Sequence, residues 1–144
     1  MPATTKFLLR IGREKKVSAR IALTDLERSR GLMNCAALGD NEGMLFVYRS
    51  DEPRAFWMKN VPINLSIGFF DAAGKLLETH EMRAGATTNT YSRADNIRYC
   101  LEMNAGWFEK NGLSENGRVC GEVFMNLRDV GVAMRARGFS LPEE

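Results

Sequence analysis

Residues 55–71 read A-F-W-M-K-N-V-P-I-N-L-S-I-G-F-F-D, and this stretch decides the expected fold. From Ile63 to Phe69, apolar residues alternate with Asn64, Ser66 and Gly68. A period of two is typical of a strand with one face in a core and the other in contact with water. The pattern therefore predicts a half-buried strand.

The first part of the stretch predicts a second strand, Phe56 to Asn60, which ends in a corner at Val61-Pro62. A residue before proline is restricted to extended geometry, which favours a sharp corner over a helix. If Met58 faces the core, Trp57 and Lys59 point to the opposite side. These two side chains are therefore the first candidates for a site.

The rest of the chain alternates short apolar runs with polar loops, a pattern that predicts a mainly β domain. Further strands are expected at Phe7–Ile11, Val17–Leu23, Met44–Tyr48, Lys75–Glu81, Ile97–Met103 and Arg118–Phe124. Loops are expected at Asn34–Gly43, Arg49–Arg54 and Met82–Asn96, the last long enough to be a binding loop.

Three short helices are expected. Thr24-Asp25-Leu26-Glu27 is a capping-box pattern and predicts a helix that ends near Met33. Asn104 can cap a second helix that runs to Lys110. Residues 126–137 predict a third, which Gly138 and then Pro142 end.

The chain has 144 residues, of which 44% are hydrophobic and 26% charged. This composition is typical of one globular domain that can bury a core without disulfides. The net charge is +2, but the first twenty residues are strongly basic. Their basic side chains, against Glu14 alone, are Lys6, Arg10, Arg13, Lys15, Lys16 and Arg20. Apolar residues interrupt this run of basic side chains, which favours solvated strand faces over a nucleic-acid surface.

The three cysteines, Cys35, Cys100 and Cys120, have no paired spacing. Together with His80 they lie too far apart in sequence to resemble a structural zinc site. We therefore expect no metal and no cofactor.

The N-terminus has no apolar signal-peptide region, and no stretch has the length of a membrane span. A cytoplasmic location is expected for the chain as given. A periplasmic or extracytoplasmic location is expected instead if a leader has been removed.

Four blocks in order resemble a known family: Gly31-Leu32-Met33, residues 41–47 (N-E-G-M-L-F-V), residues 56–60 (F-W-M-K-N), and residues 98–107 from Arg98-Tyr99 to Trp107. They are similar to the bacterial and archaeal domain of unknown function 192. The resemblance covers residues 17–121 and implies a small, mainly β single domain, a partly closed barrel or rolled antiparallel sheet, with no established activity. Residues 126–144 lie beyond it and are expected to be an appended helix and tail.

The chain departs from the family pattern at two positions. Cys35 stands where relatives commonly carry an arginine, and Val61 where a threonine is common. These replacements remove a charge and a hydroxyl near the motif blocks.

The strand alternation places Glu102 and Lys59 on the faces opposite their core residues. If these faces converge, the two residues form a small polar pocket with Trp57 as an apolar wall. The other expected members of the site are Asn60, Asn104, Glu42 and the loop Arg83 to Asn96. The alternative is an exposed Lys59–Glu102 ion pair on the sheet surface, worth at most about 1 kcal/mol.

The sequence contains no nucleophile motif and no phosphate-binding glycine loop. We therefore expect a binding or accessory domain for a small molecule or peptide, in preference to an enzyme. One alternative is a glycan hydrolase that acts through Glu42 or Glu102, with the other residue as the second carboxyl group of the pair. Another is a nucleic-acid or protein interaction module that uses the basic N-terminal strands.

Overall fold

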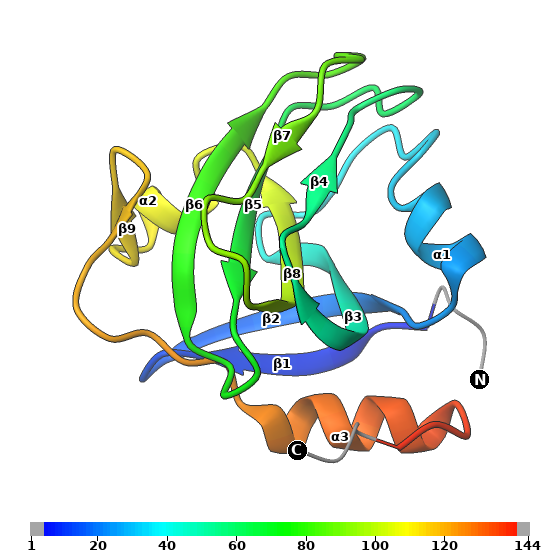
Figure 1. Ribbon diagram of the computed structural model, residues 1–144, viewed down its shortest axis with the longest axis vertical. Helices are drawn as coiled ribbons and strands as arrows, with labels where there is room; N and C mark the ends of the chain where they lie inside the picture. Colours follow the sequence, from blue (N-terminus) through cyan, green and yellow to red (C-terminus); the bar gives the residue numbers. More distant parts are fainter. Residues whose placement is uncertain (1–4, 141–144) are drawn as a thin grey trace.

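The computed structural model describes residues 5–140 and shows one open sheet of six strands (Figure 1). In spatial order the strands are β1 (Phe7–Ile11), β2 (Lys15–Ala22), β3 (Glu42–Glu52), β8 (Ile97–Asn104), β5 (Leu65–Phe70) and β6 (Leu76–Met82). Two further pairs join β4 (Ala55–Phe56) to β7 (Thr90–Tyr91) and β9 (Ser114–Glu115) to β10 (Arg118–Val119). The expected mainly β single domain is confirmed, but the sheet is not closed into a barrel.

The sheet is mixed, whereas an antiparallel sheet was expected. β2 and β3 pair in parallel, and the other neighbours are antiparallel. A parallel pair needs a crossover connection. Here residues 23–41 provide it, and they contain α1 (Asp25–Arg30).

The predicted capping box forms at the start of α1. The Glu27 amide donates to the Thr24 hydroxyl at 3.1 Å, and the Thr24 amide donates to the Glu27 carboxylate at 3.2 Å. The helix ends at Arg30, earlier than expected, because Gly31 takes a positive φ of 48°.

α2 (Trp107–Lys110) has Gly106 at its N-cap with no side-chain cap, so the predicted capping role of Asn104 is wrong. α3 (Leu127–Ala136) begins as expected at Asn126, whose side chain accepts from the Asp129 amide. The tail expected after it, with Pro142, lies outside the described residues.

β5 lies between β8 and β6 and is buried on both faces, whereas a half-buried strand was expected. The Ser66 hydroxyl lies 2.6 Å from both carboxylate oxygens of Glu81 and accepts from the Gly106 amide at 2.7 Å. At Gly68, a Cβ atom would lie 2.7 Å from the ring of Phe108. Ser66 and Gly68 therefore face α2 and not water.

Three other predicted boundaries are wrong. Residues 57–60 leave the strand after Phe56, because Met58 bonds to Ala86 and Asn60 takes a positive φ of 61°. β3 continues to Glu52 through an irregular register with β8. The last predicted strand is reduced to β10, and isolated bridges hold Phe124 and Met125.

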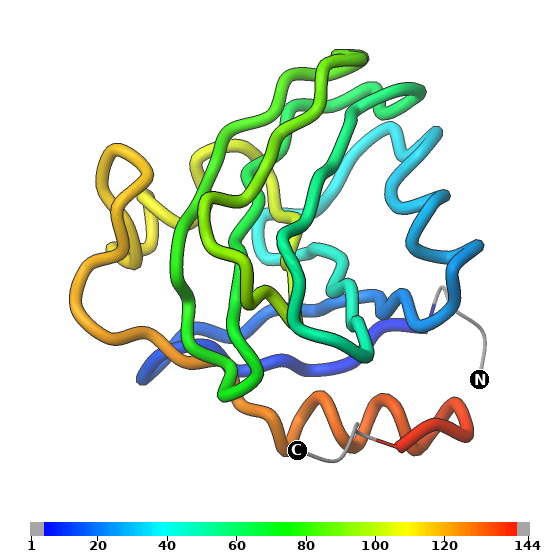
Figure 2. Tube along the Cα trace, viewed as in Figure 1, coloured from blue at the N-terminus to red at the C-terminus, as the bar shows by residue number. Residues whose placement is uncertain are grey.

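Two hydrophobic clusters lie on the two faces of the sheet. One cluster packs β1, β3 and β8 against α2 and α3, with Phe108, Val130 and Met134 as the helical members. The other packs Phe46 and Phe69 of the opposite face against Phe56 and Met58. These two residues belong to residues 55–61, which contain β4 and are called the β4 segment. Figure 2 shows the chain around β4 and β7 passing over the sheet. Residues 55–57 and Asn89 of this cover line the candidate site.

Candidate functional site

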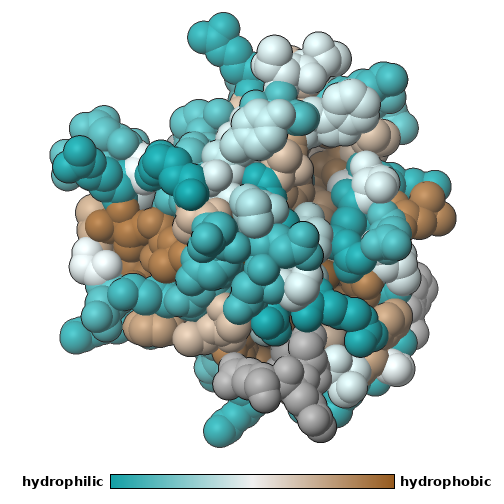
Figure 3. Space-filling view, in the orientation of Figure 1, coloured by the Kyte–Doolittle hydropathy of each residue, from teal (hydrophilic) through white to brown (hydrophobic). Residues whose placement is uncertain are grey.

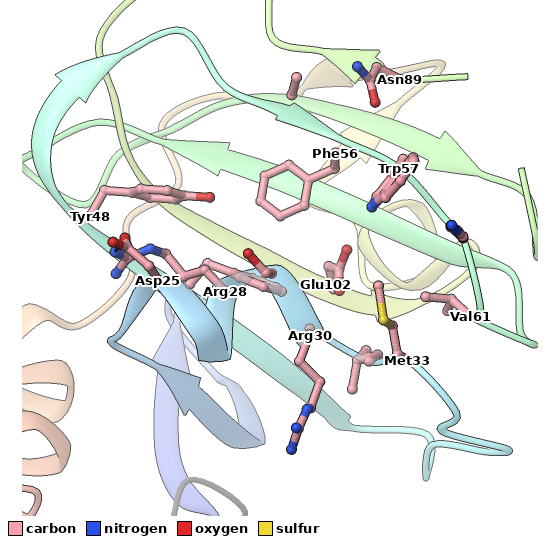
Figure 4. Close-up of a pocket in the computed structure, with 16 residues that line it drawn as sticks. Asp25, Arg28, Arg30, Met33, Tyr48, Phe56, Trp57, Val61, Asn89 and Glu102 are labelled. Atoms are coloured by element: carbon pink, nitrogen blue, oxygen red, sulfur yellow. Dashed lines mark hydrogen bonds and ion pairs between the residues drawn. The ribbon is translucent and has the colours of Figure 1, made fainter. Parts of the chain in front are cut away.

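A cavity of about 610 Å³ opens between the sheet, α1 and the β4 segment. Its walls are formed by residues 25 and 28–33, 46 and 48, 55–57, 59 and 61, with Asn89 and Glu102. Figure 4 shows these side chains, and Figure 3 shows a recess with hydrophobic surface between the β4 segment and α1. Small-molecule sites in proteins commonly have a volume in this range.

Aromatic rings form much of the wall. Phe46 and Phe56 meet edge to face with centroids 5.0 Å apart, so the two rings fix each other's position. Trp57 extends the wall toward the mouth and is 45% exposed. The mouth therefore presents a large apolar surface to solvent.

Tyr48 brings a hydroxyl to this wall. The guanidinium of Arg54 lies 3.7 Å from the centre of its ring and that of Arg28 lies 5.1 Å away. Burial raises the pKa of Tyr48, so the hydroxyl keeps its proton. In Figure 4 this hydroxyl points toward Phe56, into the cavity.

Glu102 lies at the base of the cavity. In the middle of β8 it is paired in register with Met44 on one side and Ile67 on the other. Its side chain points into the cavity (Figure 4), and the residue is only 4% exposed. A carboxyl group therefore occupies a position that would ordinarily hold a core residue.

The Glu102 carboxyl has no hydrogen bond or ion pair with any residue in the range 5–140. No fully enclosed side-chain oxygen or nitrogen in that range lacks a partner, so the carboxyl oxygens keep contact with the cavity. Burial raises the pKa of Glu102 to about 8. At neutral pH the group is therefore mainly an uncharged acid, which can both donate and accept a hydrogen bond.

Two cations of the site, Lys59 and Arg28, have contacts with groups other than Glu102. Lys59 is exposed, and its Nζ lies 5.4 Å from the centre of the Trp57 ring. Arg28 donates to the carbonyls of Leu23 and Val47 at 2.8 Å and pairs with Asp25 at 2.6 Å. Within the described part of the chain, the expected surface ion pair between Lys59 and Glu102 is therefore not formed.

Residues 7–120 match the model of domain of unknown function 192, whose description is "Uncharacterized ACR". The chain belongs to this family. The match confirms the resemblance of the four sequence blocks, which also contribute much of the cavity wall. Among functionally curated proteins, none matches the chain.

Two solved structures share the fold. One, from Sinorhizobium meliloti 1021, is described as a "putative transcription regulator"; it is 26% identical, with a TM-score of 0.74 over 83% of this chain and 96% of that one. The other is a protein of unknown function from Novosphingobium aromaticivorans DSM 12444; it is 22% identical, with a TM-score of 0.73 over 84% of each chain. Between residues 5 and 140, no helix has the length and hydropathy to cross a membrane.

Trp57, Lys59 and Glu102, three of the candidate residues from the sequence, all line the cavity. Asn60 and Asn104 do not line it. The Asn60 carbonyl accepts from the Asn34 amide at 2.7 Å, and the Asn104 amide group donates to the carbonyls of Leu38 and Gly39. Both residues therefore hold the loop that follows α1.

Glu42 also lies outside the cavity. Its carboxylate pairs with Lys6 and accepts from the Gly39 amide at 2.6 Å, and these contacts lower its pKa. Glu42 thus does not line the cavity that holds Glu102, and the two carboxyl groups differ in charge state, so the paired-carboxylate arrangement of a glycan hydrolase gains no support.

Some cavity residues were not predicted. Tyr48 ends an apolar run, and Arg28 lies on a short helix, so neither carries a local signal of function. Arg28 reaches the cavity because the crossover places α1 beside β3, where Arg28 donates to the Val47 carbonyl. Tyr48 reaches it because β3 pairs with β8, the strand of Glu102. Of the loop Arg83 to Asn96, only Asn89 lines the cavity.

The described residues hold no cluster of three histidine, cysteine, aspartate or glutamate side chains placed to bind a metal. All three cysteines are free. Glu102 is thus the chemically distinctive group of the cavity.

Proposed function

We propose that this member of domain of unknown function 192 is a binding domain that takes a small molecule in the cavity above Glu102. The observation that carries the proposal is a buried carboxyl that faces the cavity without a partner among residues 5–140. Its oxygens keep contact with the cavity, so water can reach them in the absence of a ligand. A ligand group that hydrogen-bonds to Glu102 would replace this water.

The walls support the same proposal. The rings of Phe46, Phe56 and Trp57 offer apolar surface, and the hydroxyl of Tyr48 adds a second hydrogen-bonding group. Small-molecule sites commonly combine mostly apolar walls with a few placed polar groups and a residue of perturbed pKa.

Screening a library of low-molecular-weight compounds by thermal shift and ligand-observed NMR tests the proposal. A bound compound stabilises the folded protein by mass action, so hits raise the unfolding temperature. Glu102→Leu should lose the hits, and Glu109→Gln, an exposed change on α2 at the other face of the sheet, should keep them. The proposal is contradicted by a screen without hits, or by hits that Glu102→Leu retains in full.

A second candidate function is nucleic-acid binding by the hairpin of β1 and β2. One structural neighbour is described as a "putative transcription regulator". Within the described range, Lys6 and Arg10 pair with Glu42 and Asp129, which leaves four basic side chains of this region without an ion pair: Arg13, Lys15, Lys16 and Arg20. Titration of a labelled DNA duplex at several salt concentrations tests this function. Affinity that falls steeply with salt and is lost in Lys15→Glu/Lys16→Glu would support it, and absence of binding at low salt would exclude it.

A further inference from the structure

The charges around the cavity narrow the class of ligand. Three cationic residues line it, Arg28, Arg30 and Lys59, against the single carboxylate of Asp25 outside the base. The Arg30 side chain extends from α1 toward solvent at the rim (Figure 4). Asp25 is already paired with Arg28. The lining therefore carries an excess of positive charge, which favours an anionic ligand over a cationic one.

The aromatic faces support the same choice. Aromatic rings can bind organic cations on their faces. Here the protein's own cations already occupy such positions, since Lys59 lies over Trp57, and Arg28 and Arg54 lie over Tyr48. An ammonium ligand would have to compete with these side chains for the same rings.

The base of the cavity would not attract a cation strongly either. The Glu102 carboxyl is enclosed by the sheet and has no cation of the described chain within ion-pair distance, so burial favours its uncharged form. An uncharged carboxyl can donate a hydrogen bond to an acceptor such as a carbonyl oxygen.

Building on the proposed function, we propose that the cavity binds a small organic anion with an aromatic or apolar body. The anionic group lies at the mouth beside Lys59, the body packs on Phe56 and Trp57, and an acceptor atom at the far end receives a hydrogen bond from Glu102.

Three matched probes test the charge class. They share a phenyl ring with a dimethylamide at the para position, an acceptor without an N–H group, and they end in a propanoate, a primary propanamide or a propylamine. We expect the propanoate to bind at least about tenfold more tightly than the amine, with the amide between them. Lys59→Met should weaken the propanoate about threefold, as for one exposed ion pair, and leave the amide unchanged. Lys110→Met, an exposed change on α2, is the matched control.

The pH dependence tests the role of Glu102. The titratable or charged groups that line the cavity or neighbour Glu102 on β8 are Asp25, Arg28, Arg30, Tyr48, Lys59 and Cys100. Glu102→Gln keeps all of these and keeps an uncharged donor. Wild-type affinity for the propanoate should fall about tenfold between pH 7 and pH 9 as Glu102 loses its proton. The affinity of the Gln variant should not show this fall.

Each contrary result would overturn a different part of the proposal. Equal or tighter binding of the amine overturns the assignment of an anionic ligand. A fall with pH that Glu102→Gln shares overturns the role of Glu102 as donor. If library compounds bind in the cavity but the propanoate does not, the anionic class is wrong and the proposed function stands. If neither set binds, both are wrong.

Discussion

Arg137, the residue that ends α3, forms a two-point ion pair with Glu27 of α1, in which one N–H donates to the carboxylate at 2.9 Å. Arg137 also donates to the Ile21 carbonyl at 3.2 Å. α1 forms one wall of the cavity, so the C-terminal helix, which lies outside the residues matched by the family model, is tied to that wall.

Arg137→Ala should lower the free energy of unfolding by about 1–3 kcal/mol, because it removes charge-assisted hydrogen bonds to a partly buried carboxylate. The amides of Arg28 and Gly31, which bond within α1, should exchange faster with solvent. Urea unfolding and hydrogen exchange measure these effects. Arg135→Ala, an exposed change in the last turn of α3, is the control, and equal losses in the two variants would contradict the coupling.

The ion pair between Arg137 and Glu27 also predicts that the folded protein loses stability in acid. Burial acts to raise the pKa of Glu27, but hydrogen bonds from Arg137 and from the amides of Leu23 and Thr24 outweigh it and hold the pKa at about 2, below the ordinary 4.5. A lowered pKa contributes stability that is present above pH 4.5 and is lost as the pH falls toward 2. The stability difference between wild type and Glu27→Gln in urea should therefore shrink over this range. A difference that stays constant would show that the pair does not act through its charge.

The raised pKa of Glu102 predicts the opposite dependence of stability on pH. Its pKa is raised from 4.5 to about 8, so the folded state holds a proton that the unfolded state has released. Stability from this residue is therefore lost as the pH rises from 4.5 toward 8, at up to about 1.4 kcal/mol for each unit of pKa difference. Glu102→Leu should be more stable than wild type, with an advantage that grows over the same range. Urea unfolding at several pH values measures it, and a variant less stable than wild type at pH 8 would show that the carboxyl is satisfied in the native protein.

The contact between Gly68 and Phe108 predicts a strong packing effect. Gly68→Ala would place a methyl group 2.7 Å from the Phe108 ring and 3.0 Å from Leu76. Overpacking of this kind costs about 1–3 kcal/mol. Phe108→Leu added to Gly68→Ala should cost less than the two single changes together, because the shorter side chain leaves room for the methyl group. Calorimetric unfolding of the four proteins tests this, and strictly additive losses would contradict the proposed clash.

Local patterns in the sequence predicted much of the fold. The Thr24 capping box and the strand at residues 7–11 depend on residues close in sequence, and each forms as expected. The burial of Ser66 and Gly68 was missed because alternation specifies two faces but not what covers them. Phe108, some forty residues later, supplies that cover.

The sequence also indicated only part of the candidate site, because alternation does not show what covers each face of a strand. Alternation placed Glu102 opposite Leu101 and Met103, and that face was expected to be polar. It is instead a second core, because α1 and the β4 segment cover it. Arg28 reaches the cavity through the crossover, and Tyr48 through the pairing of β3 with β8, so no spacing in the sequence records either placement.

The two tryptophans allow a direct test of where a ligand binds. Trp57 lies at the mouth of the cavity and is 45% exposed. Trp107 is 3% exposed, lies in the core of the other face and donates its indole N–H to Asn41 at 3.1 Å. The most direct measurement is an NMR titration of the two indole N–H signals with the para-dimethylamide phenylpropanoate and with the library hits. A ligand in the cavity should shift the Trp57 signal to saturation, leave the Trp107 signal in place, and lose this effect in Glu102→Leu. A stationary Trp57 signal, equal movement of both signals, or an unchanged shift in Glu102→Leu would contradict a ligand site above Glu102.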